Sequence, residues 1–333
     1  MAAARLLAVK DLYTRFHTEA GTVKAVDGIS FHVDPGETLG IVGESGCGKT
    51  VTALSLMGLL PDPPGCVSSG AIHFDGREFS PQGPPERRGL RGRGAAMIFQ
   101  EPMTSLNPVY TVGRQIAQVV RRHQGGGQRE ALGRAEEMLA MVGINNPGLR
   151  ARQYPHELSG GMRQRVMIAL ALAAGPKLLI ADEPTTALDV TIQAQILDLL
   201  QDLQERLGMA VILITHDLGV IAQMARRVLV MYAGKVMEEA PVEPLFARPL
   251  HPYTKGLLEA VPRLDMPRGQ GLGTIPGTVP DPLAVPPGCP FHPRCFLADE
   301  RCRTQEPPLQ PVAGQRRTAC WHWEKLLPGE GAA

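Results

Sequence analysis

One glycine-rich stretch strongly limits how the first half of this chain can fold. Residues 43–50 read GESGCGKT, fit the pattern G-x-x-x-x-G-K-[ST] and follow the apolar run TLGIV at 38–42. Phosphate groups need several backbone N–H donors that converge on one point, and a glycine-rich loop at the start of a helix supplies them. The stretch therefore predicts a strand, a phosphate-binding loop and a helix that begins near Lys49. A plain glycine turn is the alternative, and the strand-loop-helix context argues against it.

The residues of this loop have expected roles toward a bound nucleotide. Lys49 is expected to reach the β- and γ-phosphates, and Thr50 to bind Mg²⁺ through its hydroxyl. The positions expected to contact the nucleotide are Gly43, Glu44, Ser45, Gly46, Cys47, Gly48, Lys49, Thr50 and Val51.

A second apolar run, LLIADEP at 178–184, ends in two carboxylates. Asp182 is expected to hold Mg²⁺ through water, and Glu183 to orient or deprotonate the attacking water. An Asp-Glu pair after a strand can also simply cap a turn, so this prediction depends on the partnership with the phosphate loop.

Composition restricts the class of protein. The 34 basic and 33 acidic residues among 333 nearly cancel, which argues against a sequence-independent nucleic-acid binder. We find neither a signal peptide nor an apolar run long enough to span a bilayer, which predicts a soluble or peripheral protein. Six cysteines without a secretory signal favour a reducing compartment, where clustered thiols bind metal more often than they form disulfides.

The remaining pattern predicts an α/β protein. Short, fully apolar strands suit a parallel sheet covered on both faces by helices. Strands are expected at 71–76, 177–181 and 210–215, and helices at 112–143 (broken at 125–127), 161–174 and 191–207. Proline becomes frequent from 262 to 311, so the tail reads as an appended small domain, separate from the sheet.

The stretch LSGGMRQR at 158–165 resembles the signature of the ATP-binding cassette (ABC) family. In that family the nucleotide lies between two subunits. The resemblance implies that Ser159, Gly160 and Gly161 present a hydroxyl, backbone amides and a helix N-terminus to the γ-phosphate held by the partner subunit. An N-cap serine followed by two flexible glycines is the structural alternative.

Further positions match the family in order. Gln100 resembles the glutamine that couples the γ-phosphate and Mg²⁺ to the helical subdomain, residues 187–189 resemble the loop that crosses the dimer, and His216 matches the switch histidine. Phe16 is the candidate for stacking on adenine, with Tyr13 as second choice. The expected catalytic residues are Glu183, His216 and Gln100, and the expected Mg²⁺ ligands are Thr50, Gln100 and Asp182.

The resemblance implies an ABC-type phosphate-loop ATPase with a mixed sheet core, ATP and Mg²⁺ as cofactors, and an inserted helical subdomain. We expect the ATP-binding domain at 1–240, its helical subdomain at about 101–176, and a small metal-binding extension at 241–333.

Two strings, EPMTSLNP at 101–108 and RPLHPYTKGLLEAVP at 248–262, resemble the ATPases of oligopeptide and dipeptide importers. This resemblance implies an ATP-hydrolysing subunit on the cytoplasmic face of the inner membrane. Its implied partners are a second, different ATPase subunit, two membrane permeases and an extracytoplasmic peptide-binding protein, with no nucleic acid. The alternative is a non-transport ABC ATPase of the DNA-repair type with a zinc-binding tail.

Four cysteines gather in the tail: Cys289, Cys295, Cys302 and Cys320, with the spacing C-x₅-C-x₆-C-x₁₇-C. Four thiolates can hold tetrahedral zinc or an iron–sulfur cluster. A free-thiol tail and a pair of disulfides are the simpler alternatives. The string CPFHPRC resembles peptide-importer tails that carry a [4Fe–4S] cluster, so the resemblance favours the cluster over Zn²⁺.

Overall fold

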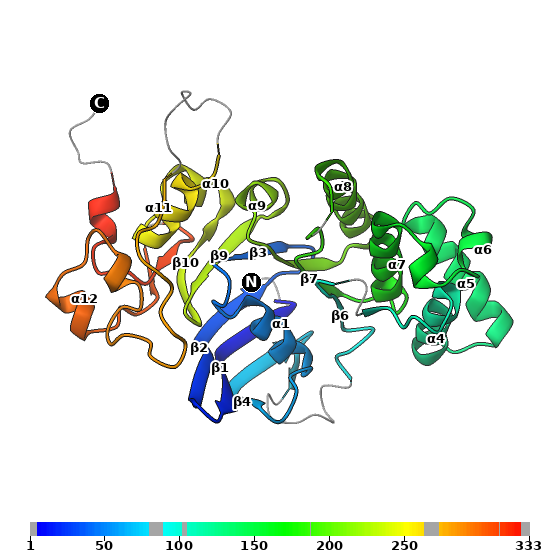
Figure 1. The fold of residues 1–333 in the computed structure, drawn as a ribbon, viewed down its shortest axis with the longest axis horizontal. Coiled ribbons are helices and arrows are strands. Elements are labelled where there is room, and N and C mark those ends of the chain that lie inside the picture. Colours follow the sequence, from blue (N-terminus) through cyan, green and yellow to red (C-terminus); the bar gives the residue numbers. More distant parts are fainter. Residues whose placement is uncertain are drawn as a thin grey trace.

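Two β-sheets form the centre of the molecule (Figure 1). The computed structural model describes residues 5–79, 89–101, 105–186, 188–262, 273–312 and 314–327. The larger sheet has eight strands in the order β11-β12-β10-β9-β3-β8-β7-β6, and the smaller is antiparallel in the order β2-β1-β4-β5.

The larger sheet is mixed. Strands β9, β3, β8, β7 and β6 run parallel, whereas β10, β12 and β11 join one edge in antiparallel pairs. Its strands are β3 (Thr38–Val42), β6 (Ala95–Ile98), β7 (Leu178–Asp182), β8 (Ala210–Ile214), β9 (Arg227–Tyr232), β10 (Lys235–Pro241), β11 (Gln310–Pro311) and β12 (Arg317–Thr318).

Both faces of this sheet are buried. Along β8, Ile212 and Ile214 enter one hydrophobic core whereas Val211 and Leu213 enter the other. Successive side chains of a strand point to opposite faces, so a strand covered on both sides reads as a continuous apolar run. This explains why the short apolar runs correctly predicted strands.

The two covering layers differ, and the expectation of helices on both faces is only half correct. One face carries α1 (Lys49–Met57) and behind it the smaller sheet, made of β1 (Leu7–Thr18), β2 (Gly21–Val33), β4 (Gly65–Phe74) and β5 (Arg77–Phe79). The other face carries α7 (Gly160–Leu172), α8 (Val190–Leu207), α9 (Leu218–Met224) and α10 (Val242–Ala247).

A helical lobe projects at the right of Figure 1. It contains α4 (Val112–Gln124), α5 (Gln128–Met141), α6 (Pro147–Arg150), the 3₁₀ turn η1 (Pro155–Glu157) and α7. The predicted break at the three glycines is confirmed, because α4 ends just before them and α5 begins just after. Part of the EPMTSLNP string, residues 102–104, lies outside the described residues.

The tail follows α11 (Pro252–Glu259) and includes η2 (His292–Arg294), α12 (Glu300–Thr304) and η3 (Trp323–Leu326). The expectation that it is separate from the sheet is wrong. Strand β12 pairs with β10 and so extends the larger sheet, and the buried Phe291 belongs to the same hydrophobic core as β7 and β9. Two-residue strands carry no hydrophobic period, so the sequence gives no sign of this pairing. None of the helices in the described ranges is long and apolar enough to cross a membrane.

Candidate nucleotide site

The phosphate loop joins β3 to α1 in a path that only glycine permits at two points. Gly43 has φ +152° and Gly48 has φ +101°. A Cβ atom on Gly43 would lie 2.2 Å from the carbonyl oxygen of Met231, and one on Gly48 would lie 2.3 Å from that of Ala25. The loop is therefore held tightly between β2 and the end of β9, with its residues positioned for α1 to begin at Lys49.

Lys49 and Thr50 occupy the positions expected of phosphate and Mg²⁺ ligands. The ammonium of Lys49 donates to the carbonyl oxygens of Gly43 at 2.8 Å and Glu44 at 3.1 Å, so it lies against the loop that it is expected to serve. The Thr50 hydroxyl donates to the Asp182 carboxylate at 3.2 Å. Burial raises the pKa of Asp182, and the hydrogen bond from Thr50 opposes this rise. The structure thus brings together an oxygen pair from α1 and β7 of the kind that Mg²⁺ prefers.

Glu183 is held by three side chains directly after β7. Its carboxylate accepts hydrogen bonds from Gln100 at 2.9 Å and from the Thr186 hydroxyl at 2.8 Å, and the Nδ1 atom of His216 lies 3.2 Å away. Burial raises the pKa of Glu183, but the hydrogen bonds from Thr186 and His216 outweigh it and hold the pKa below its usual value. The three expected catalytic residues therefore meet around an ionised carboxylate.

A cavity of about 480 Å³ opens at the phosphate loop. Among the predicted site residues, those that line it are Ser45, Gly46, Gly48, Lys49, Thr50, Val51, Gln100 and Glu183. Phe16 does not line it, because its ring lies against Gly65, where an added Cβ would approach the ring to 2.8 Å. Cys47 is buried beneath the loop, and burial raises the pKa of its thiol. Ala187, in the predicted dimer-crossing loop, lies outside the described residues.

The signature residues lie on a different element. Ser159 caps the N-terminus of α7, where its hydroxyl accepts a hydrogen bond from the backbone N–H of Met162 at 3.3 Å. Ser159 is exposed, and neither it nor Gly160 nor Gly161 lines the cavity. The N-cap interpretation therefore describes the start of α7 correctly. The role of these residues toward a partner's nucleotide stays a prediction.

Sequence reasoning missed a contact between the tail and the phosphate loop. Arg294 donates to both carboxylate oxygens of Glu44, at 2.7 and 3.1 Å. The backbone N–H of Glu44 donates to the Tyr253 hydroxyl at 2.8 Å. The Arg294 side chain is 4% exposed, so this ion pair is largely shielded from water. Both residues lie in strings that resembled peptide-importer tails, but nothing in those strings indicates their partner some 200 residues earlier.

Residues 251–253, which read HPY, form the start of α11, and hydrogen bonds fix this start against β10. The buried carboxylate of Glu238 accepts the backbone N–H groups of Leu250 at 2.9 Å and His251 at 3.0 Å, and pairs with Arg316 at 3.0 Å. Burial lowers the pKa of His251 to about 3, so the imidazole stays neutral and accepts the backbone N–H of Tyr253 through Nδ1. These bonds aim Tyr253 at the phosphate loop.

All four tail cysteines line one small cavity, together with His251, His292 and His322. Burial raises the pKa of Cys289 and of Cys320 to about 12, and the pKa values of Cys295 and Cys302 rise for the same reason. Without a cation these four thiols resist ionisation. A metal ion stabilises the thiolate form, so four thiols that converge on one cavity are a donor set that fits a metal.

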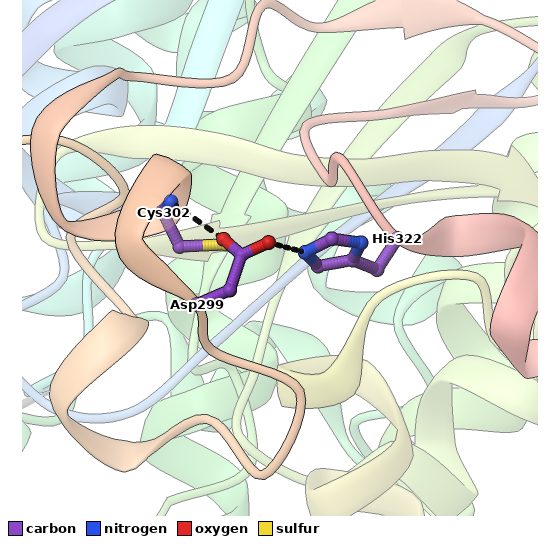
Figure 2. A group of neighbouring side chains, drawn as sticks. All are labelled: Asp299, Cys302 and His322. Carbon is purple, nitrogen blue, oxygen red and sulfur yellow. Dashed lines mark hydrogen bonds and ion pairs between the residues drawn. The ribbon is translucent and has the colours of Figure 1, made fainter.

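The four sulfur atoms, among the described residues, do not form the compact group that one zinc ion requires. Thiolates that share one tetrahedral zinc ion lie about 3.8 Å apart, given a Zn–S bond of about 2.3 Å. Within the described residues, no three of the four sulfur atoms lie within 4.8 Å of one another. A smaller group does: Asp299, Cys302 and His322 (Figure 2). There the Asp299 carboxylate accepts the backbone N–H of Cys302 and lies 2.9 Å from Nε2 of His322.

Comparison with known proteins identifies the family. A family model described as ABC transporter matches residues 26–186, and one described as the C-terminal region of oligopeptide/dipeptide transporters matches residues 237–302. The chain is 54% identical over 317 residues to the dipeptide transport ATP-binding protein DppD of Bacillus subtilis, covering 95% of this chain and 94% of that protein. This chain belongs to the ABC transporter family. As an ABC ATPase it binds and hydrolyses ATP. The cavity at the phosphate loop is the candidate site for this nucleotide.

Other relatives agree with this assignment. The ABC ATPase is 53% identical to a probable peptide ABC transporter ATP-binding protein of Sinorhizobium fredii, over 97% of this chain and 96% of that one. A solved dimeric ATP-binding cassette in a post-hydrolysis state, with ADP and phosphate bound, matches with a TM-score of 0.63 and 27% identity, covering 71% of this chain and 98% of the other. The predicted α/β fold with a mixed sheet is confirmed.

Proposed function

We propose that this ABC ATPase is the ATP-hydrolysing subunit of an importer for dipeptides or oligopeptides, and that it couples ATP binding and hydrolysis to translocation through membrane permeases. The observation that carries this proposal is the tail at 237–302, which matches the C-terminal region of oligopeptide/dipeptide transporters. Through Tyr253 and Arg294 the same tail contacts the phosphate loop directly. A segment typical of peptide transporters therefore contacts and helps to position the phosphate loop.

The proposed chemistry uses the groups gathered around the cavity. Thr50, Gln100 and Asp182 would hold Mg²⁺, which when bound neutralises charge on the β- and γ-phosphates. Glu183 orients or deprotonates the attacking water, a role suited to a carboxylate kept ionised by its hydrogen bonds. His216, whose Nδ1 atom lies 3.2 Å from this carboxylate, would contact the γ-phosphate.

The proposed assembly contains two ATPase subunits. The exposed Ser159 and the glycines after it would serve the nucleotide of the opposite subunit, since they do not line the cavity of their own chain. We infer a second, different ATPase subunit, two permeases and an extracytoplasmic peptide-binding protein that acts through the assembled complex. The ATPase would then lie at the cytoplasmic face of the cell membrane.

The four tail cysteines are proposed to hold a [4Fe–4S] cluster. Support comes from their convergence on one cavity and from sulfur distances wider than one zinc ion requires. Zinc remains the alternative, and the Asp299, Cys302 and His322 group offers it three ligands. Because Cys302 belongs to both sets, the two sites exclude each other.

Purification from membranes tests the proposed function. The full chain, tagged and expressed together with its proposed permeases, is expected to co-purify with them from detergent-solubilised membranes and to carry no DNA. Recovery only from the soluble fraction with bound DNA would overturn the proposal and favour the DNA-repair alternative.

A further inference from the structure

The nucleotide cavity has two chemically different halves. One half contains the phosphate-binding residues of the loop and the Glu183 carboxylate. Most of the rest of the lining comes from β2 and the tail and is mostly apolar: Val23 and Ala25 of β2, and Val279, Pro280, Pro282 and Val285 of the tail, with Lys24 and Asp281 as its charged members. A phosphate loop fixes where the triphosphate lies, so the nucleoside of a bound nucleotide has to occupy the second half.

The tail segment 279–285 is held in a defined shape at this place. Its turn is closed by Asp281, whose carboxylate accepts the backbone N–H of Leu283 at 2.8 Å and whose carbonyl oxygen accepts that of Ala284 at 2.8 Å. Leu283 lies against the tip of the β1–β2 hairpin, where a Cβ added to Gly21 would be 3.4 Å from its side chain. The segment therefore rests on the hairpin whose strand β2 also lines the cavity.

The same arginine that binds the phosphate loop also anchors the start of this segment. Arg294 donates through Nε to the carbonyl oxygen of Pro276 at 2.9 Å, while its terminal nitrogens bind Glu44. One buried side chain thus links the phosphate loop to the chain three residues before Val279.

We propose that the cavity-lining side chains of this segment, chiefly Val279, Pro282 and Val285, form one wall of the nucleoside pocket and contact the base and ribose of bound ATP. Proline and valine side chains provide a flat, rigid apolar surface against which a purine base packs with little loss of side-chain entropy. Phe16 does not line the cavity, so this wall supplies apolar contact with the base from the tail. The inference rests on nucleotide binding at the phosphate loop and not on peptide import.

Two ligands separate contacts to the nucleoside from contacts to the phosphates. In the full chain, Val285→Asp places a charge against the base and is expected to raise the Kd for ATP about tenfold or more, while the Kd for inorganic tripolyphosphate changes by less than about twofold. Ala284→Asp is the matched control, because Ala284 is exposed and does not line the cavity. It is expected to bind both ligands as the unchanged chain does.

Lys49→Ala provides the reference for loss of the phosphate site, since it is expected to weaken both ligands together. An unchanged ATP Kd in Val285→Asp, or an equal loss for ATP and tripolyphosphate, would overturn the proposal. Should Val285→Asp fail to fold, photo-crosslinking of the unchanged chain with 8-azido-ATP decides the question. A labelled peptide that contains residues 279–285 supports the wall, and label confined to the β1–β2 hairpin contradicts it.

Discussion

Glu183 is the residue on which the account of hydrolysis depends. It lies directly after β7 with φ +45°, a conformation that non-glycine residues seldom adopt. In this position its carboxylate reaches both Gln100 and His216, which come from other parts of the chain. Backbone strain at this point therefore coincides with the meeting of the three expected catalytic groups.

Replacing Glu183 by glutamine tests its role as the base. The amide keeps the shape of the side chain but does not accept a proton, so turnover in the assembled complex is expected to fall by about 10²- to 10⁴-fold while ATP binding is retained. The change Asp198→Asn, at an exposed carboxylate of α8 remote from the cavity, is the matched control. Near-normal hydrolysis by Glu183→Gln, measured as phosphate release, would remove Glu183 from the catalytic role.

Some residues of the candidate ATP site could be predicted from sequence motifs, and others could not. Motif order predicted that Gln100, Glu183 and His216 act together, and the structure places them in contact. Arg294 and Tyr253 were not predicted as parts of this site, because a salt bridge across 250 residues leaves no periodic or local signal in the sequence. The same reason explains why the wall at 279–285 became visible only in the folded chain.

Arg294 should affect ATP affinity through Glu44. Arg294→Ala leaves a partly buried carboxylate unpaired beside the phosphates, and we expect a roughly fivefold higher ATP Kd, as a loss of about 1 kcal/mol produces. Arg294→Lys keeps the charge but not the two parallel hydrogen bonds, so it should restore part of the affinity. Isothermal titration against Arg303→Ala, an exposed arginine of the same tail, checks this. Equal affinities in the two alanine variants would show that the ion pair has no influence on the site.

At the scale of elements, the tail is joined to the ATPase core and is not an independent unit. Strand β12 extends the larger sheet through β10, and Phe291 packs against both Tyr232 of β9 and Tyr253 of α11, whose rings also contact each other. The sequence predicted β3, β7 and β8 well because buried parallel strands read as apolar runs. It did not predict β11 and β12, because strands of two residues are defined by their partners alone.

Metal analysis tests what holds the tail together. Anaerobically purified chain is expected to contain about four iron atoms and four acid-labile sulfides, and Cys320→Ser to lose them. Cys66→Ser is the control, since Cys66 lies on β4 outside the cysteine-lined cavity. One tightly bound zinc ion with no iron or sulfide would refute the cluster and favour the zinc alternative. In that case the group of Asp299, Cys302 and His322 would be the candidate zinc site.

For the whole molecule, the proposed two-subunit assembly implies that one chain contains only part of the ATP site. The phosphate loop opens into its cavity at the start of α1, whereas the signature residue Ser159 lies at the start of α7 and does not line that cavity. Two chains that face each other would bring each helix N-terminus to the other's γ-phosphate, where it stabilises negative charge. We therefore expect the phosphate loop and the start of α7 to function across the interface between two ATPase subunits.

The isolated chain is accordingly expected to hydrolyse ATP slowly and to gain activity when the partner ATPase and the permeases are added. The specific activity of the chain alone should rise with its concentration if weak self-association occurs. Sedimentation in parallel with phosphate-release assays checks both points. Fast hydrolysis by a demonstrated monomer, independent of concentration, would show that the signature residues of a second subunit are not required.

Peptide uptake driven by ATP is the most direct test of the central claim. The complete complex is reconstituted in liposomes with Mg²⁺-ATP on the side of the ATPase and a radiolabelled peptide mixture with the binding protein on the other. Uptake is expected to require ATP and to disappear when this chain carries Glu183→Gln. Uptake that proceeds unchanged with Glu183→Gln, or no peptide uptake by a complex that hydrolyses ATP normally, would contradict the central claim.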